Sequence, residues 1–227
     1  SVLGHFWSLA VEEQFYLCWP FVVFYVAERR VPLVILGLYI VAVGAKIGMA
    51  FVGFGWFQIY SSLFTRMDSL VLGSLSAYAY VFRNDVSTDR IAKIALWVSS
   101  ATLLILFISF HGFSMLSRPV LVSVTPIMAI FCSAGIYSLL QSKQEQGLKK
   151  FCSLPVLRFF GKYSYGLYVY HYIINLVVLH LTGVEAVKHP FLPALCVFVS
   201  VNALSLIISI ISFHAFESQF LKLRTST

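Results

Sequence analysis

The chain of 227 residues is 59% hydrophobic and only 11% charged, and its formal net charge is +7. Globular proteins carry about 25% charged residues, so this composition excludes a soluble enzyme, a disordered chain and a secreted disulfide scaffold. A polytopic membrane protein remains, and a basic excess is typical of the cytoplasmic loops of such proteins. No nucleic-acid partner is therefore expected.

Long apolar segments follow one another along most of the sequence. A membrane-spanning helix needs about 20 mostly apolar residues, and seven segments meet that length. They are roughly 8–27, 32–53, 65–82, 92–110, 119–140, 163–182 and 191–213. None shows the period-two alternation of membrane strands. We predict an all-α, polytopic membrane helix bundle of about seven transmembrane helices, forming a single domain over residues 1–227.

The lysine and arginine residues are divided unequally between the predicted loops. If the seven spans alternate in direction, twelve of the sixteen fall on one side, three on the other, and Lys46 within a span. Cytoplasmic loops are enriched in Lys and Arg. The sequence therefore predicts an outer N-terminus and a cytoplasmic C-terminus.

Ionisable residues occur inside the predicted spans, where each costs about 2.5–3.5 kcal/mol on insertion scales and is a candidate for function. They are Glu12, Glu13, Lys46, Arg66, Asp68 and His171. The predicted orientation places four of them in the outer half of the membrane: Glu12, Lys46, Arg66 and Asp68. This coincidence predicts a polar pocket open to the non-cytoplasmic side.

The first span has a polar stripe whose members are separated by three or four residues and so share one helix face. They are His5, Ser8, Glu12, Tyr16 and Trp19. The stripe favours a catalytic or substrate-binding role. The alternative is a structural hydrogen-bond network in which Glu12 pairs with Lys46 or Arg66.

Two further spans carry polar residues in a pattern. In the sixth span, one face is formed by Ser164, Tyr168, His171 and Asn175. In the third, Arg66 and Asp68 are two residues apart and do not share a face. We therefore expect Arg66 to pair with a carboxylate of another helix or with an anionic ligand.

Small residues recur at four-residue spacing at Gly44 and Gly48 and at Gly73 and Ala77. This spacing predicts close packing between membrane helices. No nucleotide-binding loop, zinc-binding spacing or serine-hydrolase motif is present in the sequence, and we expect neither a metal nor a bound cofactor.

Four segments, in order, resemble the acyltransferase 3 family of integral-membrane O-acyltransferases, most of them bacterial. The first is Gly4-His-Phe-Trp-Ser-Leu-Ala-Val-Glu-Glu-Gln-Phe-Tyr-Leu-Cys-Trp-Pro20, and it is long and specific. The others are Thr65–Gly73, Tyr163–His171 and Phe213–Leu221. The last reads Glu217-Ser-Gln-Phe220 where the family has Glu-Lys-Pro-Phe.

The resemblance implies a domain of about ten helices, of which about three are expected ahead of Ser1. In the family, the first of these helices carries an Arg and a His, and the His is regarded as the catalytic base. Neither residue has a counterpart in this sequence. A non-catalytic fragment is therefore one of the alternatives.

The resemblance also implies a reaction. An acyl group, usually acetyl, would move from cytoplasmic acyl-CoA (acetyl-CoA) to a hydroxyl of a cell-surface or exported glycan or a lipid-linked saccharide. The protein would lie in the plasma membrane, the inner membrane in bacteria, among membrane lipid. The expected catalytic residues are Glu12, Arg66 and His171. The expected substrate-binding residues are Trp7, Ser8, Tyr16, Asp68 and Tyr168.

Other classes of membrane protein fit parts of the pattern. Buried Glu, Lys, Arg and His suit a proton-coupled transporter or flippase-like carrier, although carriers usually contain an internal repeat and none is found in this sequence. Seven spans also describe a heptahelical receptor, but its Asp-Arg-Tyr and Asn-Pro-x-x-Tyr motifs are missing from the third and seventh spans.

Overall fold

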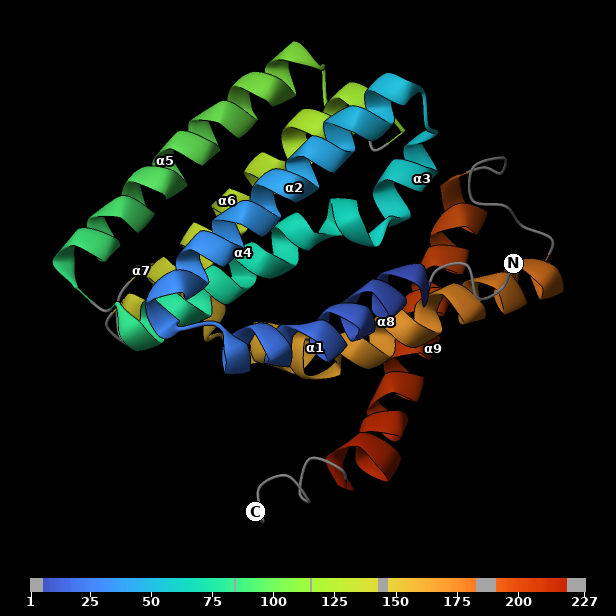
Figure 1. The fold of residues 1–227 in the computed structure, drawn as a ribbon. Coiled ribbons are helices and arrows are strands. Elements are labelled where there is room, and N and C mark those ends of the chain that lie inside the picture. Colours follow the sequence, from blue (N-terminus) through green and yellow to red (C-terminus); the bar gives the residue numbers. More distant parts are fainter. Residues whose placement is uncertain (1–5, 84, 115, 143–146, 183–190, 220–227) are drawn as a thin grey trace. The chain divides into compact units, whose positions relative to one another are not determined.

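The computed structural model describes residues 6–83, 85–114, 116–142, 147–182 and 191–219. The chain divides into two compact units. One is Trp7–Gln146, and the other is Gly147–Thr227 together with Ser1–Phe6. His5 of the predicted polar stripe lies outside the described residues, and so do four of the sixteen Lys and Arg residues of the charge distribution: Lys143, Lys188, Lys222 and Arg224. Every regular element in the described ranges is helical, which confirms the all-α class (Figure 1).

The first unit in chain order contains six α-helices and a short 3-10 turn. They are α1 (Trp7–Tyr25), η2 (Glu28–Arg30), α2 (Val31–Val52), α3 (Trp56–Ser61), α4 (Leu63–Phe82), α5 (Val86–Ser109) and α6 (Arg118–Gln141). The other unit contains α7 (Gly147–Cys152), α8 (Pro155–Thr182), α9 (Phe191–Ser212) and the π-helical turn η3 (Phe213–Glu217). Each of the seven long helices overlaps one of the seven predicted spans.

Four helical stretches of the described chain are long and apolar enough to cross a membrane by length and composition. They are Glu28–Val52, Val86–Ser109, Arg118–Gln141 and Ala194–Glu217. The remaining long helices, α1, α4 and α8, are those that carry the polar residues Glu12, Arg66, Asp68 and His171. The described chain therefore contains seven long helices where about seven spans were predicted. Four of them are apolar enough over their length to cross a membrane.

Helix boundaries differ from the predicted ones where local chemistry sets them. Helix α5 begins at Val86, earlier than hydropathy indicates, because the Asp85 carboxylate accepts the Thr88 backbone N–H at 2.7 Å. Such N-cap bonds satisfy donors that have no partner within the helix. Helix α8 begins at Pro155, and proline is favoured in the first turn because its missing N–H is not needed there.

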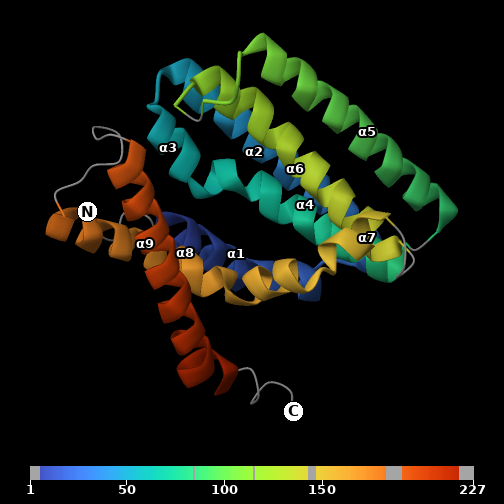
Figure 2. The ribbon, with the colours of Figure 1, turned by 180° about the vertical axis from the view of Figure 1, so that it is seen from behind.

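Helix α4 is central in the first unit: it packs against α2 and α6, and α5 packs on α6 (Figures 1 and 2). A buried apolar cluster of Phe15, Val31, Ile35, Val71 and Tyr78 joins α1, α2 and α4. The Ser76 hydroxyl lies 2.7 Å from the Ser133 hydroxyl and donates to the Ser133 carbonyl at 2.8 Å. Small polar side chains thus bring α4 and α6 close together, as is common in membrane bundles.

Close helix packing occurs at a different glycine from those predicted. A Cβ placed on Gly44, Gly48 or Gly73 meets no atom within 4 Å, so the predicted close contacts at these residues are wrong. A Cβ on Gly166 of α8 would lie 2.9 Å from the Cβ of Ser209 in α9. Only glycine allows the two helices of this unit to approach so closely.

The contact between α8 and α9 continues on both sides of Gly166. Ile174, Val197 and Val201 form a buried apolar cluster. The Tyr170 hydroxyl donates to the Ser212 hydroxyl at 3.1 Å. These contacts make the helix pair a unit with its own core.

Candidate functional site

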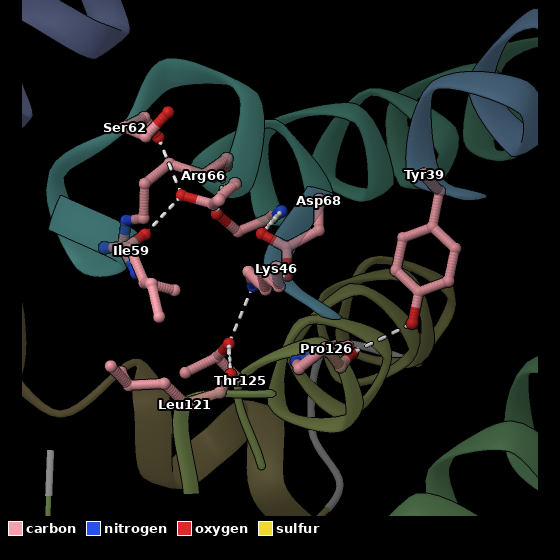
Figure 3. Close-up of polar contacts among 11 residues, drawn as sticks. Tyr39, Lys46, Ile59, Ser62, Arg66, Asp68, Leu121, Thr125 and Pro126 are labelled. Atoms are coloured by element: carbon pink, nitrogen blue, oxygen red, sulfur yellow. Dashed lines mark hydrogen bonds and ion pairs between the residues drawn. The ribbon is translucent and has the colours of Figure 1, made fainter. Parts of the chain in front are cut away.

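The turn between α3 and α4 positions Arg66. The Thr65 hydroxyl is buried and lies 2.5 Å from the Ile59 carbonyl and 2.9 Å from the Ser62 carbonyl (Figure 3). These bonds tie the end of α3 to the first turn of α4. Tyr60 follows Ile59 in the chain, and Arg66 follows Thr65. These bonds therefore place Tyr60 beside Arg66.

The Arg66 guanidinium lies against two aromatic rings. Its carbon is 4.7 Å from the ring centroid of Tyr60 and 5.6 Å from that of Trp7. The two rings are 4.9 Å apart and meet edge to face. Cation–π contacts of this kind stabilise a charge where water is scarce, so α1, α3 and α4 together hold the guanidinium in place.

No ion pair of Arg66 is found among the described residues. The sequence predicted either a carboxylate partner on another helix or an anionic ligand. The carboxylate partner is not found in the described chain, and the anionic ligand stays a prediction.

Glu12 and Arg66 line the same small cavity between α1 and α4. The cavity has a volume of about 40 Å³ and includes Trp7, Ser8 and Ser69 in its wall. Such a polar space is large enough for a water molecule or a hydroxyl group. It places a proton acceptor and a positively charged hydrogen-bond donor around one small volume.

Lys46 and Asp68 form a buried ion pair between α2 and α4, and Thr125 of α6 completes the cluster (Figure 3). The Lys46 ammonium donates to the Asp68 carboxylate and to the Thr125 hydroxyl, the latter at 2.7 Å. Lys46 is 3% exposed and Asp68 1%. The alternative in which Lys46 pairs with Glu12 is therefore wrong, because Asp68 occupies the ammonium.

A second and larger cavity begins at Arg66. It is a groove of about 270 Å³ between α4 and α6, called here the α4–α6 groove. The α4 wall includes Arg66, Asp68 and Gly73, and the α6 wall extends from Val124 to Ile136. Arg66 thus contributes to both the small cavity and the groove.

The remaining predicted residues are placed less centrally. Tyr16 is 58% exposed and lines neither cavity. Trp19 stacks on Phe15 with the ring centroids 5.1 Å apart and belongs to the apolar core. Glu13, next to Glu12, is exposed. In the polar stripe of α1, Ser8 and Glu12 therefore line the cavity, whereas Trp19 packs in the apolar core.

His171 and Tyr168 belong to α8, in the other unit. The Nδ1 atom of His171 lies 2.8 Å from the Tyr168 carbonyl and 3.0 Å from the Leu167 carbonyl, and the side chain is exposed. The rings of Tyr168 and His171 are 6.1 Å apart. Their predicted roles in catalysis and substrate binding stay predictions.

Sequence reasoning did not single out Tyr60 or Thr125. Tyr60 lies in a helix too short to register as a span, and Thr125 is a single hydroxyl within an apolar run.

Long apolar helices, with a carboxylate and a guanidinium around one small polar cavity, define an integral-membrane protein with a polar site between its helices. The chain belongs to the acyltransferase 3 family, whose acyltransferase-domain model matches residues 1–213. This confirms the resemblance to the family; the first three of the four sequence segments lie within the match, and the fourth, Phe213–Leu221, lies almost wholly beyond it.

Two relatives are O-acetyltransferases. The O-acetyltransferase OatA of Staphylococcus aureus (strain NCTC 8325 / PS 47) is 31% identical over 186 residues, covering 75% of this chain and 29% of its own length. The peptidoglycan O-acetyltransferase OatA of Listeria monocytogenes serovar 1/2a is 29% identical over 189 residues, covering 76% of this chain and 28% of its own. The chain thus spans less than a third of the length of these relatives. No solved structure gives a significant match.

Proposed function

We propose that the protein is a membrane O-acyltransferase that moves an acetyl group from acetyl-CoA to a hydroxyl of a cell-surface glycan. The observation that carries the proposal is the joint placement of Glu12 and Arg66 around one polar cavity, in a chain of the acyltransferase 3 family. The relatives named as O-acetyltransferases support acetyl as the group, and the one named for peptidoglycan supports a glycan acceptor.

The reaction forms one bond and breaks one. The acceptor hydroxyl oxygen bonds to the acyl carbon, the carbon–sulfur bond of the thioester breaks, and the hydroxyl proton ends on the CoA sulfur. The step needs a group that accepts the proton and a donor that stabilises the carbonyl oxygen as it becomes an oxyanion. Glu12 supplies or orients the base, and Arg66 supplies the donor.

The surroundings of the two residues suit these roles. The 40 Å³ cavity admits a hydroxyl group, and Glu12 and Arg66 in its wall are partly shielded from water, which strengthens the electrostatic interactions between them. Arg66 is already held by Trp7 and Tyr60, so little reorganisation is needed when charge develops. Ser8 lines the same cavity and is proposed to bind the acceptor.

The predicted orientation gives the reaction its direction. Basic residues of α7 and the start of α8, on the side predicted to be cytoplasmic, attract the phosphates of acyl-CoA; they are Lys149, Lys150, Arg158 and Lys162. The glycan lies on the opposite side, towards which the Glu12 cavity is predicted to open. His171, Tyr168, Tyr16 and Asp68 are proposed to contribute to the same reaction, as the sequence predicts.

The experiment that tests the proposal measures alkali-labile acyl esters on surface polysaccharide in cells with and without the full-length gene. We expect ester content to fall on deletion and to return with the wild-type gene. Equal ester content in both strains would contradict glycan acylation.

A further inference from the structure

The α4–α6 groove has a polar end and a mostly apolar end. Arg66 and Thr125 lie at the polar end, and Met128, Ala129 and Ile136 line the continuation along α6. The rise of 1.5 Å per helical residue separates Thr125 from Ile136 by about 16 Å. This length and polarity match an amphiphile that has a compact head and a hydrocarbon chain.

The charges at the polar end favour an anionic head. The Asp68 carboxylate is bonded to the Lys46 ammonium and to the Ser69 backbone N–H, at 2.8 Å for the latter. Its charge is therefore offset within the protein. Arg66 has no ion-pair partner among the described residues, and a guanidinium at membrane depth is stabilised by an anion.

The chemistry of the guanidinium favours phosphate. Arginine presents planar N–H donors that match phosphate oxygens in pairs, which a lysine ammonium does not. Tyr60 and Trp7 fix the guanidinium beforehand.

The groove is accessible along its side. Ser69 and Gly73 on α4, and Cys132 and Ile136 on α6, line it and are exposed. A ligand can therefore enter laterally, as a lipid would from the bilayer. Gly73 keeps this side open, because no atom lies within 4 Å of where its Cβ would be.

We propose that the α4–α6 groove binds a lipid with a phosphate headgroup, with the phosphate at Arg66 and the hydrocarbon chain along α6 from Thr125 to Ile136. This site shares Arg66 with the proposed acyl-transfer site, but lipid labelling tests it without reference to acyl transfer. It explains why an arginine at the start of α4 has aromatic neighbours but no carboxylate partner in the described chain.

The test is photo-crosslinking of the full-length protein in a maltoside detergent, which contains no phosphate. One probe is phosphatidylglycerol with a diazirine on an acyl chain, and the other is diacylglycerol with the same chain. We expect phosphatidylglycerol to label the segments 69–73 and 124–136 about tenfold more than diacylglycerol, the factor corresponding to one charge-assisted hydrogen bond. Equal labelling by the two probes would overturn the proposal.

Matched variants separate the groove from the rest of the surface. Arg66→Gln removes the phosphate donor and Gly73→Leu fills the groove, so both are expected to reduce labelling. Arg118→Gln and Gly48→Leu alter an arginine and an open glycine outside the groove and are expected to leave labelling unchanged. Labelling that is insensitive to Arg66→Gln and Gly73→Leu contradicts the site.

Two controls keep the test decisive. Arg66→Lys retains the charge and is expected to retain part of the labelling, and size-exclusion chromatography verifies that each variant is folded. If Arg66→Gln does not fold, Gly73→Leu and Arg66→Lys decide the outcome. Excess inorganic phosphate is expected not to displace the lipid probe, since the chain contributes to binding; displacement would assign the site to free phosphate instead.

Discussion

Lys46 of α2 and Asp68 of α4 are bonded to each other in the interior of the bundle, and both are almost completely buried. A buried ion pair whose two partners are desolvated is stabilising only while it is intact. Because Thr125 also accepts a bond from the same ammonium, the pair connects three helices. The cluster therefore fixes the position of α4, which also carries Arg66.

Breaking this pair from one side is expected to be costly. Asp68→Asn or Lys46→Met leaves one buried charge without its partner and is expected to lower the free energy of unfolding by about 3–5 kcal/mol. The double variant Lys46→Met/Asp68→Leu removes both charges and is expected to lose less than the sum of the single changes. Thermal unfolding in detergent measures all of these.

The exposed pair of Lys93 and Asp89 is the control for that series. These residues are four apart on α5 and their side chains are 61% and 33% exposed. Exposed pairs contribute little to stability, so Asp89→Asn is expected to change the unfolding temperature much less than Asp68→Asn. Equal effects of the two substitutions would show that the Lys46–Asp68 pair is not buried as described.

Adjacent carboxylates on α1 allow a direct test of the small cavity. Glu12 lines it with Arg66, whereas Glu13 is exposed. Glu12→Gln keeps the shape and removes the charge, and is expected to lower glycan ester content by about 100-fold or more, the range for loss of a general base. Glu13→Gln is expected to leave ester content close to wild type at equal protein levels.

The close approach of α8 and α9 predicts a steric effect at Gly166. Gly166→Ala places a methyl group 2.9 Å from the Ser209 Cβ, so the helices must separate and the unfolding temperature is expected to fall. Gly161→Ala on the same helix meets no atom within 4 Å. It is expected to be neutral or slightly stabilising, since alanine favours helix more than glycine does.

The N-cap of α5 predicts a dependence of stability on pH. Hydrogen bonds from Thr88 and Ser87 lower the pKa of the Asp85 carboxyl. A lowered pKa in the folded state stabilises the protein above the pKa of the unfolded chain, and this contribution is lost as the pH falls through the folded value. Asp85→Ala is therefore expected to lower the unfolding temperature at pH 7.

The same substitution is expected to have a smaller effect below the folded-state pKa, where the carboxyl is protonated in both states and only a neutral cap is lost. Asp85→Asn keeps a capping side chain at all pH values and is expected to lie between wild type and Asp85→Ala at pH 7. A difference between wild type and Asp85→Ala that does not change with pH would contradict the charge-dependent part of the cap.

Hydropathy predicted the long helices because each buries its backbone polar groups internally and needs a fixed apolar length. The predicted spans also place Glu12 and Arg66 in the same half of the membrane. Helical periodicity gives the face of one helix but not the neighbour that this face meets. For that reason the sequence suggested Glu12 as a partner of Lys46, whereas the structure pairs Lys46 with Asp68.

Other features depend on local bonds that no apolar pattern records. Helix α3 is a single short element whose position is set by the Thr65 hydroxyl. The predicted close contacts at Gly44 and Gly48 failed because spacing shows which glycines share a face, not whether another helix lies there. Tyr16 shares the stripe of Glu12 by periodicity but is exposed and does not line the cavity.

The most direct test of the proposed acetyl transfer uses the full-length protein in proteoliposomes supplied with acetyl-CoA. We expect that adding a glycan acceptor releases CoA in step with ester formation, and that Glu12→Gln lowers both by about 100-fold or more while Glu13→Gln leaves both close to wild type. Uptake of a solute driven by a pH gradient, with no CoA released on acceptor addition, would contradict it and assign the buried charges to a carrier.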